Sequence, residues 1–111
     1  MMTKTDSPAI VLTTVGSRED AGRLASEIVD ARLAACVNIV EGVVSVYRWE
    51  GRVMEESELL LIIKTTMKRA AELRQHFAAS HPYEVPELVV LAIDDLSEGY
   101  GKWLLESTSE G

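Results

Sequence analysis

Two long runs of β-prone residues flank a single turn near the middle of this 111-residue chain, and they restrict the fold more than any other feature. The first run extends over Cys36–Trp49 and the second over Met54–Thr66, with the turn at Glu50 and Gly51. Gly51 favours a turn because glycine adopts positive φ without steric cost. Each run could form a strand of about 12 residues, whereas a typical strand has about 5–6. The sequence therefore predicts an unusually long antiparallel hairpin.

Alternating strand and helix signals surround this hairpin. The predicted elements are a strand at 9–15, a helix from Ser17 to about Arg32, a helix at 67–80, a strand at 88–93 and a short helix at 97–106. With the hairpin, the order is β-α-β-β-α-β-α, and its first six elements match the split βαβ pattern of a ferredoxin-like fold. We therefore predict an α+β fold with an antiparallel sheet against two helices and an extra C-terminal helix.

The tip of the predicted hairpin carries large apolar side chains. A hairpin of this length projects past its two covering helices, so Tyr47, Trp49 and Val53 would be left in water. Self-association through the hairpin would cover them and close the sheet edges against neighbouring subunits. The alternative is a bulge that breaks the hairpin into shorter pieces. We favour self-association.

Length and composition predict a single globular domain. Hydrophobic residues make up 47% and charged residues 26% of the chain, which is the balance of a folded protein. We expect the domain to span residues 8–106, between disordered tails at 1–7 and 107–111. Cys36 is the only cysteine, so the chain has no internal disulfide framework.

Charge and hydropathy argue against two classes of protein. The longest apolar runs, at 59–63 and 88–93, are far shorter than the roughly 20 residues of a membrane span. Residues 9–15 lack a signal-peptide cleavage pattern, so we expect a cytoplasmic location. The net charge is −7, with 11 basic residues against 18 acidic ones, whereas a nucleic-acid binder normally has a basic patch.

The segment His81–Glu87 combines rigidity with polar groups. Pro82 and Pro86 each fix their own φ and favour an extended conformation in the preceding residue. An imidazole, a phenol and two carboxylates lie close together on this segment: His81, Tyr83, Glu84 and Glu87. The segment leads directly into the predicted strand at 88–93. It is therefore a candidate site as well as a rigid structural joint.

The possible metal ligands do not show the spacing of a tight metal site. His81 and Cys36 are the candidates, because imidazole and thiolate suit copper or zinc. However, the chain has no C-x-x-C, H-x-x-x-H or H-E-x-x-H pattern, and a structural zinc site needs four ligands. A weaker site assembled between subunits remains open.

No motif predicts an enzyme. The chain lacks a G-x-S-x-G turn and any signature around Cys36, and its glycines do not form a phosphate-binding loop. We therefore predict a protein without catalytic residues and without an obligatory cofactor.

Lys64 lies late in the second long strand, among apolar neighbours. If it is buried it needs a carboxylate, since an unpaired interior ammonium is very costly. Glu84 or Glu87 could supply that carboxylate in a structural salt bridge. Alternatively, Lys64 could recognise an anionic ligand in a cleft.

Several motifs keep the order and spacing of a known family. They are the stretches Arg32–Ile39 (Arg-Leu-Ala-Ala-Cys-Val-Asn-Ile), Tyr47–Gly51 (Tyr-Arg-Trp-Glu-Gly), Glu58 with Leu61–Thr66, His81–Glu87, and the pair Tyr100 and Trp103. Together they span roughly residues 9 to 105 and resemble the CutA family of divalent-cation tolerance proteins.

The resemblance implies a ferredoxin-like homotrimer, related in architecture to the PII signalling proteins, with long hairpins packed between subunits. It also implies a role in tolerance to divalent metals, copper in particular, without enzymatic activity. Some members bind copper through a strand cysteine and a His-His pair before Pro-Tyr. This chain has Thr13 and Ser80 at two of those positions, so His81 alone is retained, with Cys36 as a secondary candidate.

Two hypotheses follow for the inter-subunit clefts. The first is divalent cation binding, with copper as a candidate, in a protein of metal homeostasis. The rival is a PII-like regulator that binds a small anionic metabolite in the same clefts, with Lys64 as anchor. Besides His81 and Cys36, the predicted cleft residues are Trp49, Glu58, Lys64, Tyr83, Glu84 and Glu87.

Overall fold

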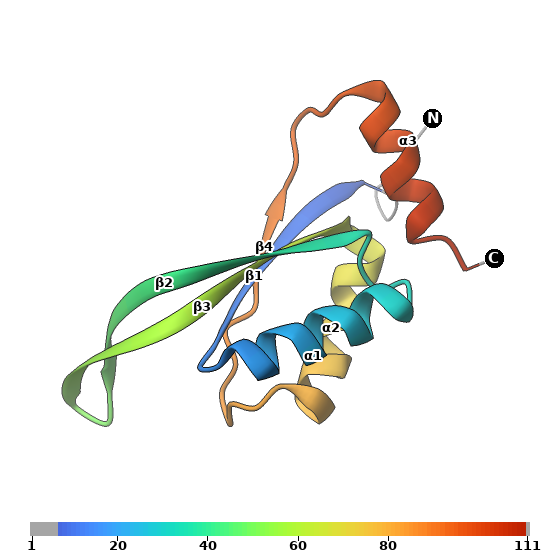
Figure 1. Cartoon of the computed structure of the whole chain (residues 1–111). Helices are drawn as coiled ribbons and strands as arrows, with labels where there is room; N and C mark the ends of the chain where they lie inside the picture. Colours follow the sequence, from blue (N-terminus) through green and yellow to red (C-terminus); the bar gives the residue numbers. More distant parts are fainter. Residues whose placement is uncertain (1–6, 111) are drawn as a thin grey trace.

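Within residues 7–110, four antiparallel strands and three helices make up the α+β fold (Figure 1). The computed structural model describes residues 7–110. The elements in chain order are β1 (Pro8–Val15), α1 (Arg18–Asp30), β2 (Cys36–Trp49), β3 (Arg52–Thr66), α2 (Met67–Ser80), β4 (Val89–Ala92) and α3 (Glu98–Ser107).

The sheet has the strand order β2-β3-β1-β4, and each neighbouring pair is antiparallel. Val11 at the centre of β1 lies opposite Ile63 of β3 and Val90 of β4. Helices α1 and α2 lie together on one side of the sheet, while α3 lies at the end remote from the hairpin tip (Figure 1). The order and pairing confirm the predicted ferredoxin-like arrangement.

The core lies between the sheet and helices α1 and α2. Side chains alternate across a strand, so one face of β1 and β3 can be buried against the helices. The helices contribute apolar residues at helical spacing to the same layer. The fully buried members of this core are Val11, Val15, Ala21, Leu24, Ile28, Leu61, Ile63 and Leu73, with Ala70 and Phe77 almost fully buried.

Polar side chains cap the two long helices at their N-termini. Ser17 Oγ accepts a hydrogen bond from the backbone N–H of Asp20, which satisfies one of the free donors of α1. Thr66 does the same for the N–H of Arg69 in α2. Pro82, two residues beyond Ser80, cannot continue α2, so the helix ends where the sequence predicts.

The hairpin is both long and bulged. Strands β2 and β3 have 14 and 15 residues, and their register shifts between Val40 and Val43, where Gly42 adopts φ 74°. The strands continue past this bulge to a tip at Glu50 and Gly51, where both residues have positive φ. The hairpin therefore projects well beyond α1 and α2 (Figure 1).

The ends of the folded region differ in part from the prediction. Ser107 is the last residue of α3, and the next residue, Thr108, is buried. The Thr108 carbonyl accepts a hydrogen bond from Arg69 Nε at 2.8 Å, so the predicted disordered tail does not begin at residue 107. Of the N-terminal tail predicted at 1–7, all but Ser7 falls outside the described residues, as does Gly111.

Candidate functional site

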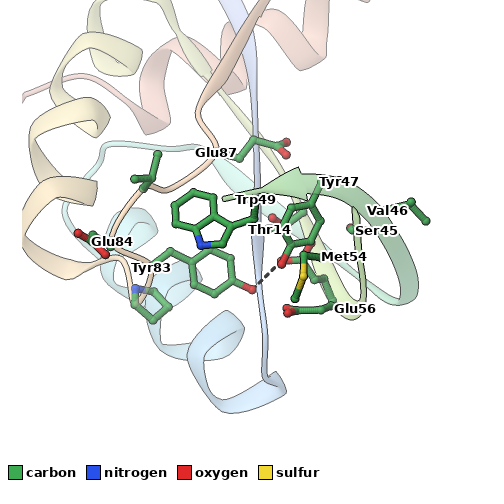
Figure 2. Close-up of a pocket in the computed structure, with 13 residues that line it drawn as sticks. Thr14, Ser45, Val46, Tyr47, Trp49, Met54, Glu56, Tyr83, Glu84 and Glu87 are labelled. Atoms are coloured by element: carbon green, nitrogen blue, oxygen red, sulfur yellow. Dashed lines mark hydrogen bonds between the residues drawn. The ribbon is translucent and has the colours of Figure 1, made fainter. Parts of the chain in front are cut away.

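A cavity of about 740 Å³ lies between the outer part of the hairpin and the segment that follows α2 (Figure 2). We call it the hairpin cleft. Its size falls within the range of pockets that bind small organic molecules, about 300–1,000 Å³. Its lining residues are Thr14, Ser45, Val46, Tyr47, Trp49, Met54, Glu56, Glu58, Pro82, Tyr83, Glu84, Val85 and Glu87.

Strand β3 supplies the carboxylate wall of this cleft. Met54, Glu56 and Glu58 are spaced two residues apart, so their side chains point to the same face of the strand. Tyr47 of β2 lies directly opposite Met54 in the register and reaches the same face. The pleat of the hairpin therefore places an aromatic ring, a thioether and two carboxylates side by side.

Tyr83 connects the segment after α2 to this wall. Its hydroxyl donates a hydrogen bond of 2.6 Å to Glu58 Oε2, drawn as a dashed line in Figure 2. Glu58 is 8% exposed, which makes it a nearly buried carboxylate. Burial and the acceptor Glu58 raise the pKa of Tyr83 well above its usual range, so the hydroxyl stays protonated and remains a donor.

The cleft carries concentrated negative charge. Among the described residues, four carboxylates line it, namely Glu56, Glu58, Glu84 and Glu87, and no lysine, arginine or histidine does. Partial burial and the nearby charge of Glu58 raise the pKa of Glu87. Because like charges disfavour each other's ionised form, a cation in the cleft would relieve this repulsion.

His81 lies behind Tyr83, with both ring nitrogens in use. Nδ1 accepts a hydrogen bond from the backbone N–H of Tyr83 at 3.1 Å, so Nε2 carries the proton and donates to Thr13 Oγ1 at 3.0 Å. Burial lowers the pKa of His81, which favours this neutral form. The ring also packs against those of Phe77 and Tyr83. A metal ion could bind His81 only by displacing one of these hydrogen bonds.

Cys36 and Lys64 lie away from the cleft, at the other end of the hairpin. The two residues face each other across β2 and β3. Lys64 is six residues from Glu58, which corresponds to about 20 Å along an extended strand. Within residues 7–110, no ion pair joins Lys64 to Glu84 or Glu87. Within these residues the suggested salt bridge is therefore absent, because Glu84 and Glu87 line the cleft with Glu58 and Lys64 does not.

Cys36 has an aromatic environment instead. Its Sγ lies 3.5 Å from the hydroxyl of Tyr100, and the ring of Tyr100 packs against Trp103 with the centroids 5.3 Å apart. The hydrogen bond with Cys36, together with partial burial, raises the pKa of Tyr100 to about 12. Cys36 and His81 therefore belong to two separate neighbourhoods.

The predicted site residues thus divide into three groups. The structure brings together five of the predicted cleft residues: Trp49, Glu58, Tyr83, Glu84 and Glu87. His81 lies next to the cleft without lining it, while Cys36 and Lys64 are remote from it. Sequence reasoning missed Tyr47 and Glu56 as cleft residues, although the two-residue spacing from Glu58 could have indicated Glu56 and that from Trp49 could have indicated Tyr47.

The described part of the chain contains no preformed metal centre. Within residues 7–110, no group of three or more His, Cys, Asp or Glu side chains is arranged so that it could hold a metal ion. The residues that suit copper best, His81 and Cys36, are too far apart to share an ion. A single subunit therefore does not fit a tight copper site.

Comparison with known proteins identifies the family. The model of the "CutA1 divalent ion tolerance protein" family matches residues 9–107. The chain belongs to the CutA1 family. It is 50% identical over 99 residues to the divalent-cation tolerance protein CutA of Thermus thermophilus and covers 89% of its own length and 96% of that protein. Against the chloroplastic protein CutA of Arabidopsis thaliana, the identity is 49% over 95% of this chain and 58% of the relative.

Solved CutA1 structures have the same fold. The structure from Thermus thermophilus superposes with a TM-score of 0.89 at 48% identity and covers 92% of this chain and 99% of that one. The structure from Oryza sativa gives a TM-score of 0.91 at 44% identity and covers 98% and 100%. These matches support the ferredoxin-like fold and assign the chain to a family named for divalent-cation tolerance.

The names of the relatives point to different cellular compartments. One relative is named chloroplastic and a structure from Archaeoglobus fulgidus is named periplasmic, so the cytoplasmic location stays a prediction. Within residues 7–110, no helix has the length and apolar character needed to cross a membrane.

Proposed function

We propose that this protein is a non-enzymatic homotrimer that acts in divalent-cation tolerance and binds divalent cations weakly in the hairpin cleft. The observation that carries the proposal is the cleft itself, in which four carboxylates gather without a basic side chain among its lining residues. Membership of the CutA1 family supports the role in tolerance.

The exposed outer hairpin supports self-association. Val44, Val46 and Val53 are 62%, 63% and 67% exposed, and Trp49 is also exposed. Apolar side chains concentrated on a projecting element favour burial against another protein surface. In addition, β2 and β4 are the two edges of the sheet and have free edges in the single chain. The number of three subunits rests on the resemblance to the CutA family.

Carboxylate chemistry favours weak and broad cation binding. Oxygen ligands suit hard ions such as Mn²⁺ and also accept borderline ions such as Cu²⁺ and Zn²⁺. The engaged nitrogens of His81 and the remote thiol of Cys36 do not favour a dedicated copper site. We therefore expect the cleft to bind copper through carboxylate oxygens alone and hence weakly, as it binds other divalent cations.

No observation favours the rival in which the cleft binds an anionic metabolite. Lys64, its proposed anchor, does not line the cleft, and the lining residues carry negative charge. An anion in this cavity would face Glu56, Glu58 and Glu87 without a compensating cation from the same chain.

Light scattering tests the assembly. We expect the native chain to have three times the 12.2 kDa mass of one chain at micromolar concentration. Val44→Asp should give a smaller species, because a charge in an apolar interface is costly to bury. Ser26→Asp, which places the same charge on the exposed side of α1, is the matched control and should remain trimeric. A monomeric native chain would contradict the proposal.

Calorimetric titration tests the cation site. Mn²⁺ and Cu²⁺ should each bind the native protein weakly, and Glu58→Gln should weaken both. His81→Ala is the comparison for copper, since it removes the imidazole and leaves the cleft carboxylates in place. If His81→Ala abolishes Cu²⁺ binding while Glu58→Gln does not, the cleft is not the cation site.

A further inference from the structure

The side of the sheet that faces away from α1 and α2 is apolar. Leu61 and Ile63 of β3 point to the helices, so the residues that alternate with them point to the other side. The strand register aligns such residues from neighbouring strands in rows across the sheet. We call this surface of the inner sheet the open face, and its main apolar side chains are Ile10, Leu12, Leu60, Ile62, Val89 and Leu91.

Much of the open face is exposed in a single chain. Val89 and Leu91 are 42% and 46% exposed, and Ile62 on a central strand is only partly buried. The outer surface of the helices is charged instead, with ion pairs such as that of Arg23 with Glu27 on α1. A contiguous apolar surface favours burial against another protein. We therefore expect the helices to face the solvent in an assembly and the open face to lie in an interface.

The outer half of the hairpin has a second apolar surface, on the reverse side of the sheet. The cleft residues of β3 continue the alternation of Leu60, so the cleft and the open face lie on the same side. The residues that alternate with them point to the other side, beyond the ends of the helices (Figure 1). We call this surface the valine face, after its exposed members Val44, Val46 and Val53. Figure 2 shows Val46 pointing away from the neighbouring ring of Tyr47.

Two different surfaces on opposite sides of one sheet restrict how copies of the chain can assemble. A surface that pairs with its own copy makes a two-fold contact, which gives a dimer. Contact between the open face of one copy and the valine face of the next is head-to-tail, and such a contact closes into a ring when the rotation permits. A ring of three copies covers every open face and every valine face once. The two surfaces thus fit a trimer better than a dimer.

The charged residues of the two surfaces have opposite signs. Lys64 lies on the open face, and Glu55 lies opposite Val46 on the valine face. Within residues 7–110, neither of them forms an ion pair. Arg48, also on the valine face, donates to the carbonyl of Gly51 in its own turn. An ammonium in an apolar interface is costly unless a carboxylate pairs with it, so the two surfaces are complementary in charge as well as apolar.

These observations assign a partner to each surface. We propose that the valine face of one subunit packs on the open face of the next subunit in a head-to-tail ring, with Glu55 of the first near Lys64 of the second. The inference rests on the proposed homotrimer and adds the two surfaces that form it. It also explains how a hairpin that projects beyond its own helices is covered, because the sheet of a second copy takes the place of those helices.

Mixing two variants tests the head-to-tail contact. Val44→Asp places a charge on the valine face, and Val89→Asp places one on the open face. Each variant alone should be monomeric, because every contact needs one surface of each kind. An equimolar mixture should form a dimer of one copy of each, since the intact valine face of one variant meets the intact open face of the other. Native mass spectrometry at high protein concentration measures these masses, and circular dichroism checks that each variant is folded.

Val29→Asp is the matched control. Val29 is 40% exposed, close to the 42% of Val89, but it lies on α1 at the other side of the molecule. This variant should keep the mass of the native assembly. Three outcomes would overturn the inference: a dimer formed by either variant alone, a native mass retained by Val44→Asp or Val89→Asp, or a mixture that stays monomeric. A monomeric native chain would instead contradict the homotrimer itself, so the two failures are distinguishable.

Charge reversal tests how the two surfaces are aligned. Lys64→Glu and Glu55→Lys each place like charges opposite each other, and each should raise the concentration at which the assembly dissociates about tenfold or more. The double variant restores opposite charges and should assemble more tightly than either single variant. Lys64→Glu combined with Glu19→Lys on α1 is the control and should show no recovery. A double variant of Lys64 and Glu55 that assembles no better than the single variants would overturn the proposed packing of the two faces.

Discussion

The two halves of the hairpin differ in what covers them. The inner half, Cys36–Val40 paired with Leu60–Lys64, lies over the helices and contributes Leu61 and Ile63 to the core. The outer half, Val43–Trp49 paired with Arg52–Glu58, extends past the helices and leaves its valines exposed. The bulge at Gly42 separates the halves. One continuous pair of strands therefore contributes to the core at one end and leaves apolar side chains exposed at the other.

This division explains why the outer half can carry apolar residues without being part of the core. Burial of apolar surface stabilises a chain only where another surface excludes water. The inner half finds that surface in α1 and α2, whereas the outer half has to find it in another molecule or in the ligand of the cleft. Substitutions in the two halves should therefore differ in how much they lower the stability and in whether this loss depends on chain concentration.

The largest effect is expected in the inner half, at Leu61. This side chain is fully buried, so Leu61→Ala removes packed methyl groups and leaves a cavity. We expect a loss of about 2–5 kcal/mol in the free energy of unfolding, measured by chemical denaturation. The loss should be independent of chain concentration, because the contacts lie within one subunit.

Val46→Ala is the matched substitution in the outer half. An exposed side chain normally contributes within about 0.5 kcal/mol, so a larger loss would indicate that a partner covers Val46. In that case, the loss should grow as the chain concentration rises, because a larger fraction of the chains is then assembled. If Val46→Ala costs as much as Leu61→Ala at every concentration, the proposed difference between the halves is wrong.

Tyr83→Phe tests the contact that joins the outer hairpin to the segment after α2. The change removes only the hydroxyl that donates to Glu58, and a nearly buried carboxylate then lacks its donor. We expect a loss of about 1–3 kcal/mol by denaturation. Glu58→Gln in the Tyr83→Phe background should recover part of this loss, since an amide is less costly to bury than a charge. A double variant no more stable than Tyr83→Phe alone would show that the unpaired Glu58 carboxylate does not cause the loss of stability.

Acid should destabilise the protein through His81. Burial lowers the pKa of the folded form below the ordinary value of about 6.5, so the unfolded chain binds the extra proton more readily. The contribution of His81 to stability is therefore complete above about pH 6.5 and decreases as the pH falls through that value. One proton changes the free energy of unfolding by at most about 1.4 kcal/mol per pH unit.

His81→Gln should flatten this part of the pH profile in denaturation curves measured between pH 5 and 8. His76→Gln is the control, because His76 lies on α2 beside Glu27 and makes no contact with the His81 hydrogen bonds. If His76→Gln flattens the profile and His81→Gln does not, the acid sensitivity comes from another part of the molecule.

Sequence periodicity was sufficient to predict the fold because the helices and strands have clear signals in the sequence. Ser17 and the proline at 82 predict helix ends, and the two β-prone runs predict the hairpin. Glu58 was placed at a common site with the proline segment by the resemblance to the CutA family and not by these signals. The sequence leaves a bulge as the alternative to a long hairpin, whereas the structure contains both, since Gly42 absorbs the extra residue without ending the strands.

The composition of the site depended on pairing that local patterns do not encode. Their residue types make Cys36 and His81 candidate metal ligands, yet strand register places Cys36 opposite Lys64, near the end of β3. The partner of His81 is Thr13, which is 68 residues away in the sequence. A contact between such distant residues follows from the packing of β1 against α2. Local spacing therefore does not identify the partners that Cys36 and His81 have within one chain.

The smallest expected effect lies at the tip of the outer half, at Glu50. This residue has φ 50° and precedes Gly51 at φ 77°, which is the conformation of a type I′ turn. Asparagine adopts positive φ more easily than glutamate, so Glu50→Asn should stabilise the chain by a few tenths of a kcal/mol up to about 1 kcal/mol. Glu55→Asn, at a position in the middle of β3, is the control and should not stabilise it. Thermal denaturation would detect a higher midpoint for Glu50→Asn only if the outer half unfolds together with the core. An unchanged midpoint, combined with slower amide exchange at the tip, would show that the two halves of the hairpin unfold separately.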